Sequence, residues 1–329
     1  MNKKKLLALG ATLMSTMLFA SCTSPSKKVK FSENWYLDTT YDIKPGVTET
    51  LTYSVSFEAG SAADTTHRAL RYNQGTFTTN LTTEYSGTHN AFVYRYSTSL
   101  EISGEHECKA TAEIQVFTDT VTSEVVFTSA MNGLKPISST KSIVSHTPTV
   151  ILEPTSISEC YTKYNYKVET SYDASLNGTS VQTIFQEGEG KDPLVTTTNF
   201  TAKDEDYTTL DNEQLMLALR GMGSYSSQKF NVYNNSWKRS QLVKLEVAAE
   251  ESEEFSFEMN GENKKVTLTY IPLSLGIQEN DSGAAQTFLI AKTSDRTNNV
   301  YRNVVLKCSS PLYNAFGSLE YKLIKANFI

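Results

Sequence analysis

The stretch LTYSVSF at residues 51–57 alternates apolar with small polar side chains. Leu51, Tyr53, Val55 and Phe57 occupy every second position, with threonine or serine between them. Successive side chains of a β-strand point to opposite faces, so this period of two places the apolar side chains on one face and the hydroxyls on the other. Strands of buried parallel sheets are apolar on both faces. The stretch therefore predicts an antiparallel strand with one buried face.

The same alternation recurs along the chain and predicts a mainly β protein. It is repeated at residues 164–168, 255–259 and 266–270. We expect roughly 13 to 16 strands from this pattern. Asn-Gly pairs between strand-like runs are typical of primed hairpin turns, and the chain has them at Asn132-Gly133, Asn177-Gly178 and Asn260-Gly261.

Two of the expected strands are long and indicate the type of sheet. They cover residues 66–84 and 161–176. Strands of this length favour one broad, twisted antiparallel sheet over a compact sandwich of short strands. A β-sandwich remains the alternative fold.

Residues 211–221 break the alternation and predict a helix. Asp211 is the expected N-cap, Gln214 the residue that reaches back to it in a capping box, and Gly221 the residue that ends the helix. Little of its circumference is polar, so the helix must be covered. It is expected to pack against the sheet, or in addition to border a groove for a hydrophobic ligand. The residues at helical spacing that would form the wall of that groove are Leu215, Ala218, Leu219 and Met222.

The N-terminal segment has the pattern of an export signal. Lys3, Lys4 and Lys5 precede an apolar run at residues 6–20, which as a helix would be about 22 Å long, short of the roughly 30 Å core of a bilayer. The run ends in LFASC, and this resembles the bacterial lipobox, in which a cysteine becomes the lipid-modified N-terminus. The resemblance implies a lipoprotein signal peptide at residues 1–21 and lipidation at Cys22.

The resulting domain organisation is a membrane-anchored β protein. A lipidated tether is expected at residues 22–42, and an antiparallel β domain at residues 43–329. The export signal implies an extracytoplasmic location. Two or three acyl chains on one residue give stable anchoring, so the protein is expected on a bacterial membrane. The tether is polar and would let the folded part stand away from the bilayer.

Composition argues against nucleic acid as a partner. The chain has 30 Lys plus Arg and 36 Asp plus Glu, a net charge of −6. Loss of residues 1–21 removes three lysines and no acid, which leaves a net charge of about −9.

The cysteines and histidines do not form a metal-binding or redox motif. Cys108, Cys160 and Cys308 are far apart in sequence, so we expect buried free thiols rather than a disulfide framework. The four histidines are expected singly at the surface, and no cofactor or metal is predicted.

Catalytic motifs are not supported by their context. The segment SSTK places Ser138 and Lys141 at SxxK spacing, but that chemistry needs the serine at the start of a buried helix, and Pro136 begins a strand-like stretch here. We therefore expect no catalytic residues and a non-enzymatic protein.

Several segments resemble a known type of envelope protein. The stretches GAAQTFLIAKTSDRTNNVYRNVVLK and FGSLEYKLI near the C-terminus, with TYSVSFEAG and GLKPIS earlier, are similar in order to a family of uncharacterised bacterial envelope proteins and to the LolA and LppX-like lipoprotein-carrier half-barrels. The resemblance implies a highly curved antiparallel sheet wrapped around one short apolar helix, with an apolar concave face. It implies no functional residues.

The leading hypothesis is therefore a lipid-anchored protein that binds or carries a hydrophobic or amphiphilic molecule in a concave groove. Two alternatives remain open: a surface adhesion or glycan-binding lipoprotein that uses some of its 18 tyrosines, and a structural protein of the envelope.

Overall fold

The computed structural model describes residues 27–32, 48–149, 151, 153–188, 190–235, 238–277, 285–292, 301–312 and 315–328. Within these ranges the chain forms 17 strands, slightly more than the alternation predicted. The predicted signal peptide and Cys22 lie outside the described residues. None of the helices in the described part of the chain is long and apolar enough to cross a membrane.

The first nine strands are β1 (Thr48–Ala59), β2 (Arg68–Tyr72), β3 (Gly75–Ser86), β4 (Ala91–Cys108), β5 (Glu113–Phe127), β6 (Pro136–Pro148), β7 (Tyr161–Tyr172), β8 (Gly178–Ile184) and β9 (Leu194–Phe200). The other eight are β10 (Thr208–Asp211), β11 (Gln228–Asn234), β12 (Arg239–Val247), β13 (Glu251–Met259), β14 (Glu262–Ile277), β15 (Gln286–Ala291), β16 (Val305–Pro311) and β17 (Gly317–Phe328). The long strand expected at residues 66–84 is thus divided into β2 and β3.

The strands form one large, mainly antiparallel sheet, as predicted. From β3 to β9 each strand pairs with the next one along the chain. On its other side β3 pairs with β1, and β1 pairs with β17. The sheet then continues through β16, β15, β14 and β12 to β11, with the short β10 parallel to β11 at its end. The two ends of the sheet are therefore β9 and β10.

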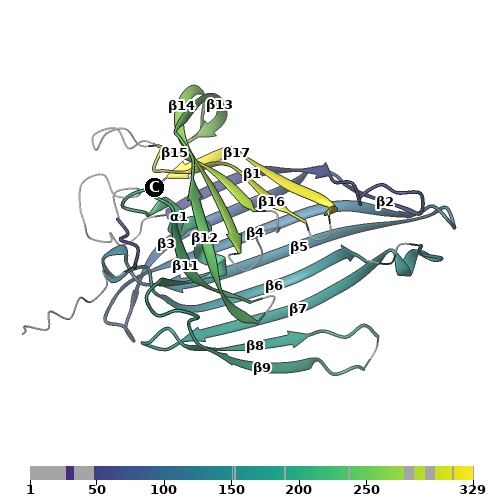
Figure 1. Cartoon of the computed structure of the whole chain (residues 1–329), viewed down its shortest axis with the longest axis horizontal. Coiled ribbons are helices and arrows are strands. Elements are labelled where there is room, and N and C mark those ends of the chain that lie inside the picture. Colours follow the sequence, from purple (N-terminus) through teal and green to yellow (C-terminus); the bar gives the residue numbers. More distant parts are fainter. Residues whose placement is uncertain are drawn as a thin grey trace, which may run out of the picture.

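The sheet curves back on itself, and its ends meet on one side. Figure 1 shows the long strands β3 to β9 lying side by side, with β11, β12 and β14 crossing in front of them at a steep angle. Phe200 at the end of β9 stacks on Tyr233 of β11, with ring centroids 3.6 Å apart. Beside it, Thr170 of β7 hydrogen-bonds to Asn235, just beyond β11. The architecture is thus barrel-like rather than a sandwich.

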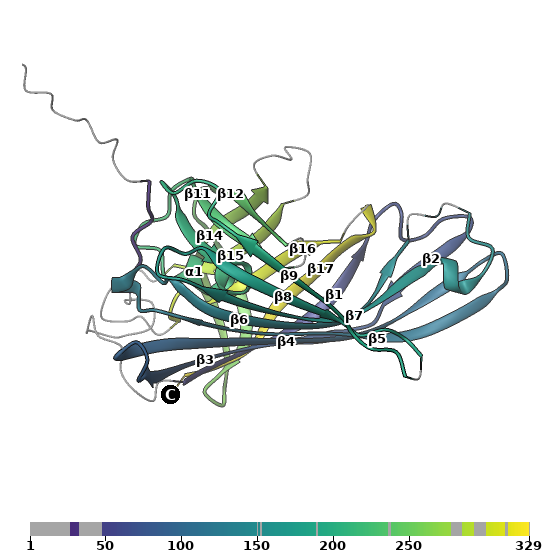
Figure 2. The same ribbon diagram turned by 90° about the horizontal axis from the view of Figure 1, so that it is seen from below.

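The predicted helix is present and lies inside this curve. Asn212–Gln214 form a 3₁₀ turn that continues into α1 (Leu215–Arg220), and Asp211 and Gln214 form the predicted capping box. Gly221 follows the helix with an ordinary φ of −86°, so the left-handed cap is not used. Seen from below, α1 lies between the layer of β3 to β6 and the layer of β11, β12, β14 and β15 (Figure 2).

One of the three expected Asn-Gly hairpin turns is of the primed type. Asn260 and Gly261 both have positive φ, 49° and 86°, and join β13 directly to β14. The prediction was wrong for the other two pairs. Asn132 belongs to a short 3₁₀ helix between β5 and β6, and Gly178 already pairs with Tyr172 across a five-residue loop.

Part of the predicted tether is docked on the folded body. Lys27 forms an isolated bridge with Tyr207, and Phe31 forms one with Met222. The Ser32 N–H donates to the carbonyl of Gly221 at 2.7 Å. Residues 27–32 therefore lie against the start of β10 and the end of α1.

Candidate functional site

A cavity of about 260 Å³ lies between the inner face of the sheet and the start of α1. Both halves of the chain contribute to it, because β15 to β17 supply the wall opposite β3 to β6. Its lining residues are Phe77, Tyr96, Thr98, Leu100, Val121, Lys141, Asn212, Glu213, Leu215, Met216, Gln286, Phe288, Cys308 and Tyr321.

The helix contributes to this cavity through its first residues only. Leu215, predicted to face a groove, lines the cavity. Its neighbour Met216 also lines the cavity, although it is not among the residues that the helical spacing indicated. Ala218, Leu219 and Met222 are 2%, 1% and 4% exposed and belong to the hydrophobic core instead. The helix is apolar nearly all round, so the sequence did not distinguish the side that faces the cavity from the side that faces the core.

The sheet adds an apolar stripe that the sequence did not reveal. One side chain from each strand from β3 to β9 stands directly opposite the next, all on the inner face. We call this row the apolar stripe: Phe77, Leu100, Val121, Ile143, Tyr166, Ile184 and Leu194.

The apolar stripe connects the cavity to the open end of the sheet. Phe77, Leu100 and Val121 line the cavity. Beyond them, the exposed fraction rises from 8% at Ile143 to 55% at Leu194 on the edge strand β9. Strands are about 4.8 Å apart, so the stripe extends about 29 Å, the length of an extended acyl chain or more. The stripe is therefore a continuous apolar surface that starts under cover and ends in solvent.

A buried ion pair forms the polar wall of the cavity. Lys141 Nζ lies 2.9 Å from Glu213 Oε1, and their side chains are only 14% and 8% exposed. Burial acts to lower the pKa of Lys141, but attraction to Glu213 outweighs it and raises the pKa. Burial also acts to raise the pKa of Glu213, but Lys141 outweighs it and holds the pKa below its usual value. Both groups are therefore charged at neutral pH, beside an otherwise largely apolar cavity.

Asp211 lies next to this pair, and its carboxyl group is fully buried. Burial and the nearby Glu213 raise the pKa of Asp211 to about 6, although Ser139 and Tyr172 each donate a hydrogen bond to it at 2.6 Å. The carboxylate joins β6, β7 and the helix start, so its protonation is linked to the stability of the closed side of the sheet.

A second polar cluster lies at the ends of β4 to β7 that are remote from α1. Asp119 accepts hydrogen bonds from Tyr72 at 3.1 Å and from the main-chain N–H of His146 at 2.8 Å, and lies 2.8 Å from Nδ1 of His146. His106 is 1% exposed and stacks on Tyr161, and burial lowers its pKa to about 4. The expectation of surface histidines was wrong for His106, because its strand turns this face inward. No group of three His, Cys, Asp or Glu suited to a metal occurs among the described residues.

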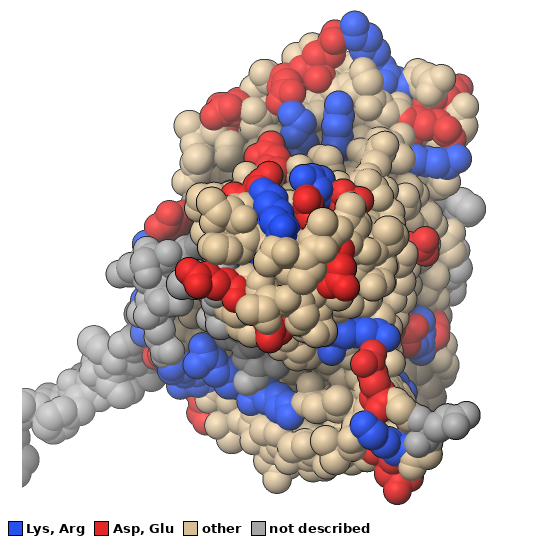
Figure 3. All heavy atoms as spheres, turned by 90° about the vertical axis from the view of Figure 1, so that its right-hand side faces the viewer, with Lys and Arg blue, Asp and Glu red and all other residues tan. Residues whose placement is uncertain are grey.

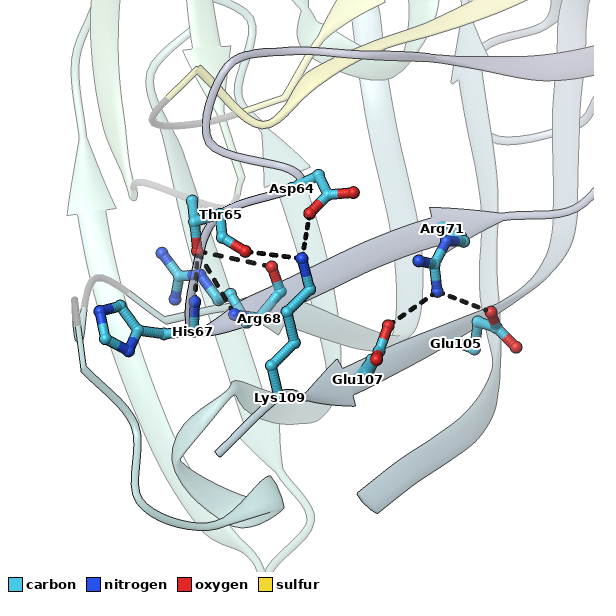
Figure 4. Close-up of polar contacts among 8 residues, drawn as sticks. All are labelled: Asp64, Thr65, His67, Arg68, Arg71, Glu105, Glu107 and Lys109. Atoms are coloured by element: carbon cyan, nitrogen blue, oxygen red, sulfur yellow. Dashed lines mark hydrogen bonds and ion pairs between the residues drawn. The ribbon is translucent and has the colours of Figure 1, made fainter. Parts of the chain in front are cut away.

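Exposed ion pairs cover the outside of the same end. Arg71 of β2 contacts Glu105 and Glu107 of β4, and Lys109 contacts Asp64 (Figure 4). Acidic and basic side chains are interspersed on this face of the molecule in Figure 3. These pairs hold β2 against β4 and give the face no large area of one charge.

Most of the described tyrosines are buried or half-buried. Tyr53, Tyr94, Tyr96 and Tyr233 are at most 2% exposed. Among the described tyrosines, the strongly exposed ones are Tyr85 and Tyr164. The tyrosines therefore act mainly as core residues.

Comparisons with known proteins do not assign this chain to a family. No protein-family model matches, and no curated protein matches. Among solved structures, the chain is similar to a β-barrel-like protein of domain of unknown function DUF1849 from Brucella abortus. The identity is 8% and the TM-score 0.47, over 87% of this chain and 99% of that one. The resemblance to LolA and LppX-like carriers stays a prediction.

Proposed function

We propose that this chain is a lipid-anchored, extracytoplasmic, non-enzymatic protein that binds an amphiphilic molecule along the apolar stripe. The observation that carries the proposal is the stripe itself, which leads from the cavity to an exposed edge of the sheet. Contiguous exposed apolar surface on a monomer generally marks a binding site. Here the surface is lined up across consecutive strands, so one extended chain can lie along it and contact several of its residues in turn.

The size of the cavity favours one acyl chain over several. Pockets that enclose a whole drug-sized ligand measure about 300–1,000 Å³. The cavity beside α1 measures about 260 Å³. It accommodates the end of one chain, with the rest on the apolar stripe, and does not enclose a lipid with several chains.

The closed side of the sheet sets the direction of the ligand. Phe200 and Tyr233 block the side where the two edges meet, whereas Leu194 at the opposite end of β9 is exposed. We infer that the tail enters over β9 and reaches Met216, which leaves the polar head near the outer end of the stripe.

A fluorescent single-chain fatty acid tests this proposal directly. We expect saturable binding at micromolar concentration to the chain without residues 1–22. Leu100→Trp should reduce binding, because Leu100 lines the cavity and the larger ring takes up part of its volume. Ser99→Trp is the matched control, since Ser99 is the neighbouring residue on the outer face of β4 and is exposed. Equal binding by both variants, or no binding of any single-chain amphiphile, would contradict the proposal.

A further inference from the structure

Cys108 and Cys160 lie near each other, at the end of the sheet that is remote from α1. Cys108 ends β4, and Cys160 directly precedes β7, after the short 3₁₀ helix Ile157–Glu159. Both residues are 0% exposed, and each thiol is near enough to the other to shift its pKa. Cysteines separated by 52 positions in the sequence thus meet in the fold.

Independent contacts fix both residues at this position. Cys108 Sγ lies 3.9 Å from the carbonyl oxygen of Pro154, and Cys160 Sγ lies 3.7 Å from that of Ser156. The two sulfur atoms are therefore held against the same short stretch of the β6 to β7 connection.

Arg68 provides a second connection between the end of β4, at Cys108, and the segment before β7, at Cys160. It stands opposite Cys108 in the pairing of β2 with β4, and its guanidinium donates to the carbonyl of Thr149 at 2.5 Å. The Thr149 N–H in turn donates to the carbonyl of Cys160 at 3.1 Å. On the other side of Cys108, Lys109 is tied to Asp64 and Thr65 (Figure 4). The thiol pair is thus embedded in a framework that holds both backbones.

We propose that Cys108 and Cys160 are a disulfide-forming pair, closed by thiol–disulfide exchange with a small or protein disulfide. In the first step the Cys108 thiolate attacks one sulfur of that disulfide, forms a mixed disulfide and releases one thiol. Cys160 then loses its proton and attacks the Cys108 sulfur, and the second thiol leaves. The two cysteines lose two electrons and two protons in total, and the reactant disulfide is reduced to two thiols.

The surroundings favour Cys108 as the attacking residue. Burial acts to raise the pKa of the Cys108 thiol, but hydrogen bonds from Thr111 and from Cys160 outweigh it, so the pKa is lowered. Burial raises the pKa of Cys160 to about 11. Since the thiolate is the nucleophile, exchange begins at Cys108 during folding, before Pro154 and Ser156 have packed on the two thiols.

Peptide mapping of the full chain tests the pair. The protein is unfolded and reduced, refolded with oxidised glutathione, blocked with an alkylating agent in denaturant, and digested with trypsin without reduction. Cleavage after Arg95, Lys109, Lys141 and Lys163 gives peptides 96–109 and 142–163, each with one of the two cysteines. We expect these peptides to be joined, with a mass equal to their sum less two hydrogen atoms.

Cys308 is the matched control, because it is also buried and its thiol lies against Gln286, in a different part of the fold. It should be alkylated in the same sample, and Cys308→Ser should leave the joined peptides unchanged. Cys160→Ser should abolish them. Complete alkylation of both Cys108 and Cys160 in the folded, oxidised protein, or joining of either one to Cys308 instead, would overturn the proposal. The readout is a covalent bond, so it is independent of ligand binding.

Discussion

Replacement of Leu194 by aspartate should weaken binding of a single-chain fatty acid without weakening the fold. Leu194 forms the outer end of the apolar stripe, and 55% of it is exposed in the free protein. A ligand whose chain extends from the cavity to the outer end of the stripe therefore covers this side chain.

The expected size of the effect follows from the exposed surface. Full burial of a leucine side chain contributes about 1.5–3 kcal/mol. Roughly half of that is available at Leu194, about 0.8 to 1.6 kcal/mol, and the ligand would also have to desolvate the new carboxylate. We expect the Kd to increase about tenfold.

The neighbouring residue provides a control of equal charge. Val195 is 64% exposed and points to the outer face of the same strand, since successive side chains alternate. Val195→Asp places the same charge at the same edge and should leave the Kd unchanged within about a factor of two. Both variants should keep the free energy of unfolding within about 0.5 kcal/mol of the parent, because both sites are exposed.

A fluorescence titration of the three proteins, with a thermal melt of each, measures these quantities. Equal weakening by Leu194→Asp and Val195→Asp would mean that charge at the edge matters and the stripe does not. Unchanged binding in Leu194→Asp would show that the ligand does not reach β9.

Three further predictions concern the anchor and the stability of the fold. Cys22→Ser should abolish incorporation of a radiolabelled fatty acid and leave the signal peptide uncleaved, and labelling that persists would place the lipid elsewhere. Arg220→Met should reduce the free energy of unfolding in urea by about 3–5 kcal/mol, because Arg220 donates to both oxygens of the buried Glu49 at 2.6 and 2.9 Å. A loss below about 1 kcal/mol would contradict a structural role for the pair. The raised pKa of Asp211 means that the folded state holds this proton more tightly than the unfolded state, so the associated stability is complete below pH 4 and is lost as the pH rises through about 6. Asp211→Asn should remove that loss, and equal changes of melting temperature between pH 4 and pH 7 in the two proteins would refute the assignment.

Local features of the fold could be predicted because local patterns determine them. Leu51, Tyr53 and Val55 in the LTYSVSF stretch are at most 1% exposed, as the alternation requires. The capping box of Asp211 and Gln214 follows from two residues three positions apart. Buried cysteines were also expected, and all three described cysteines are buried.

The candidate site depends on contacts across the whole chain, so most of it could not be predicted. The apolar stripe starts at Phe77 and ends at Leu194, and it exists only in one strand register, which a shift of one residue would destroy. In the sequence, Lys141 stands out only as part of the SxxK spacing with Ser138, whose context argues against catalysis. Its partner Glu213 is 72 positions away in the sequence and comes near only when the sheet closes around α1.

The most direct test of the central claim is to locate the bound ligand by photocrosslinking. A single-chain fatty acid with a photoreactive group at its methyl end is bound, irradiated and mapped by mass spectrometry. We expect labels at the inner end of the apolar stripe and on the start of α1, at Leu100, Val121 and Met216. Labels on exposed apolar residues of the outer face, such as Val116 or Val195, in place of these would contradict it.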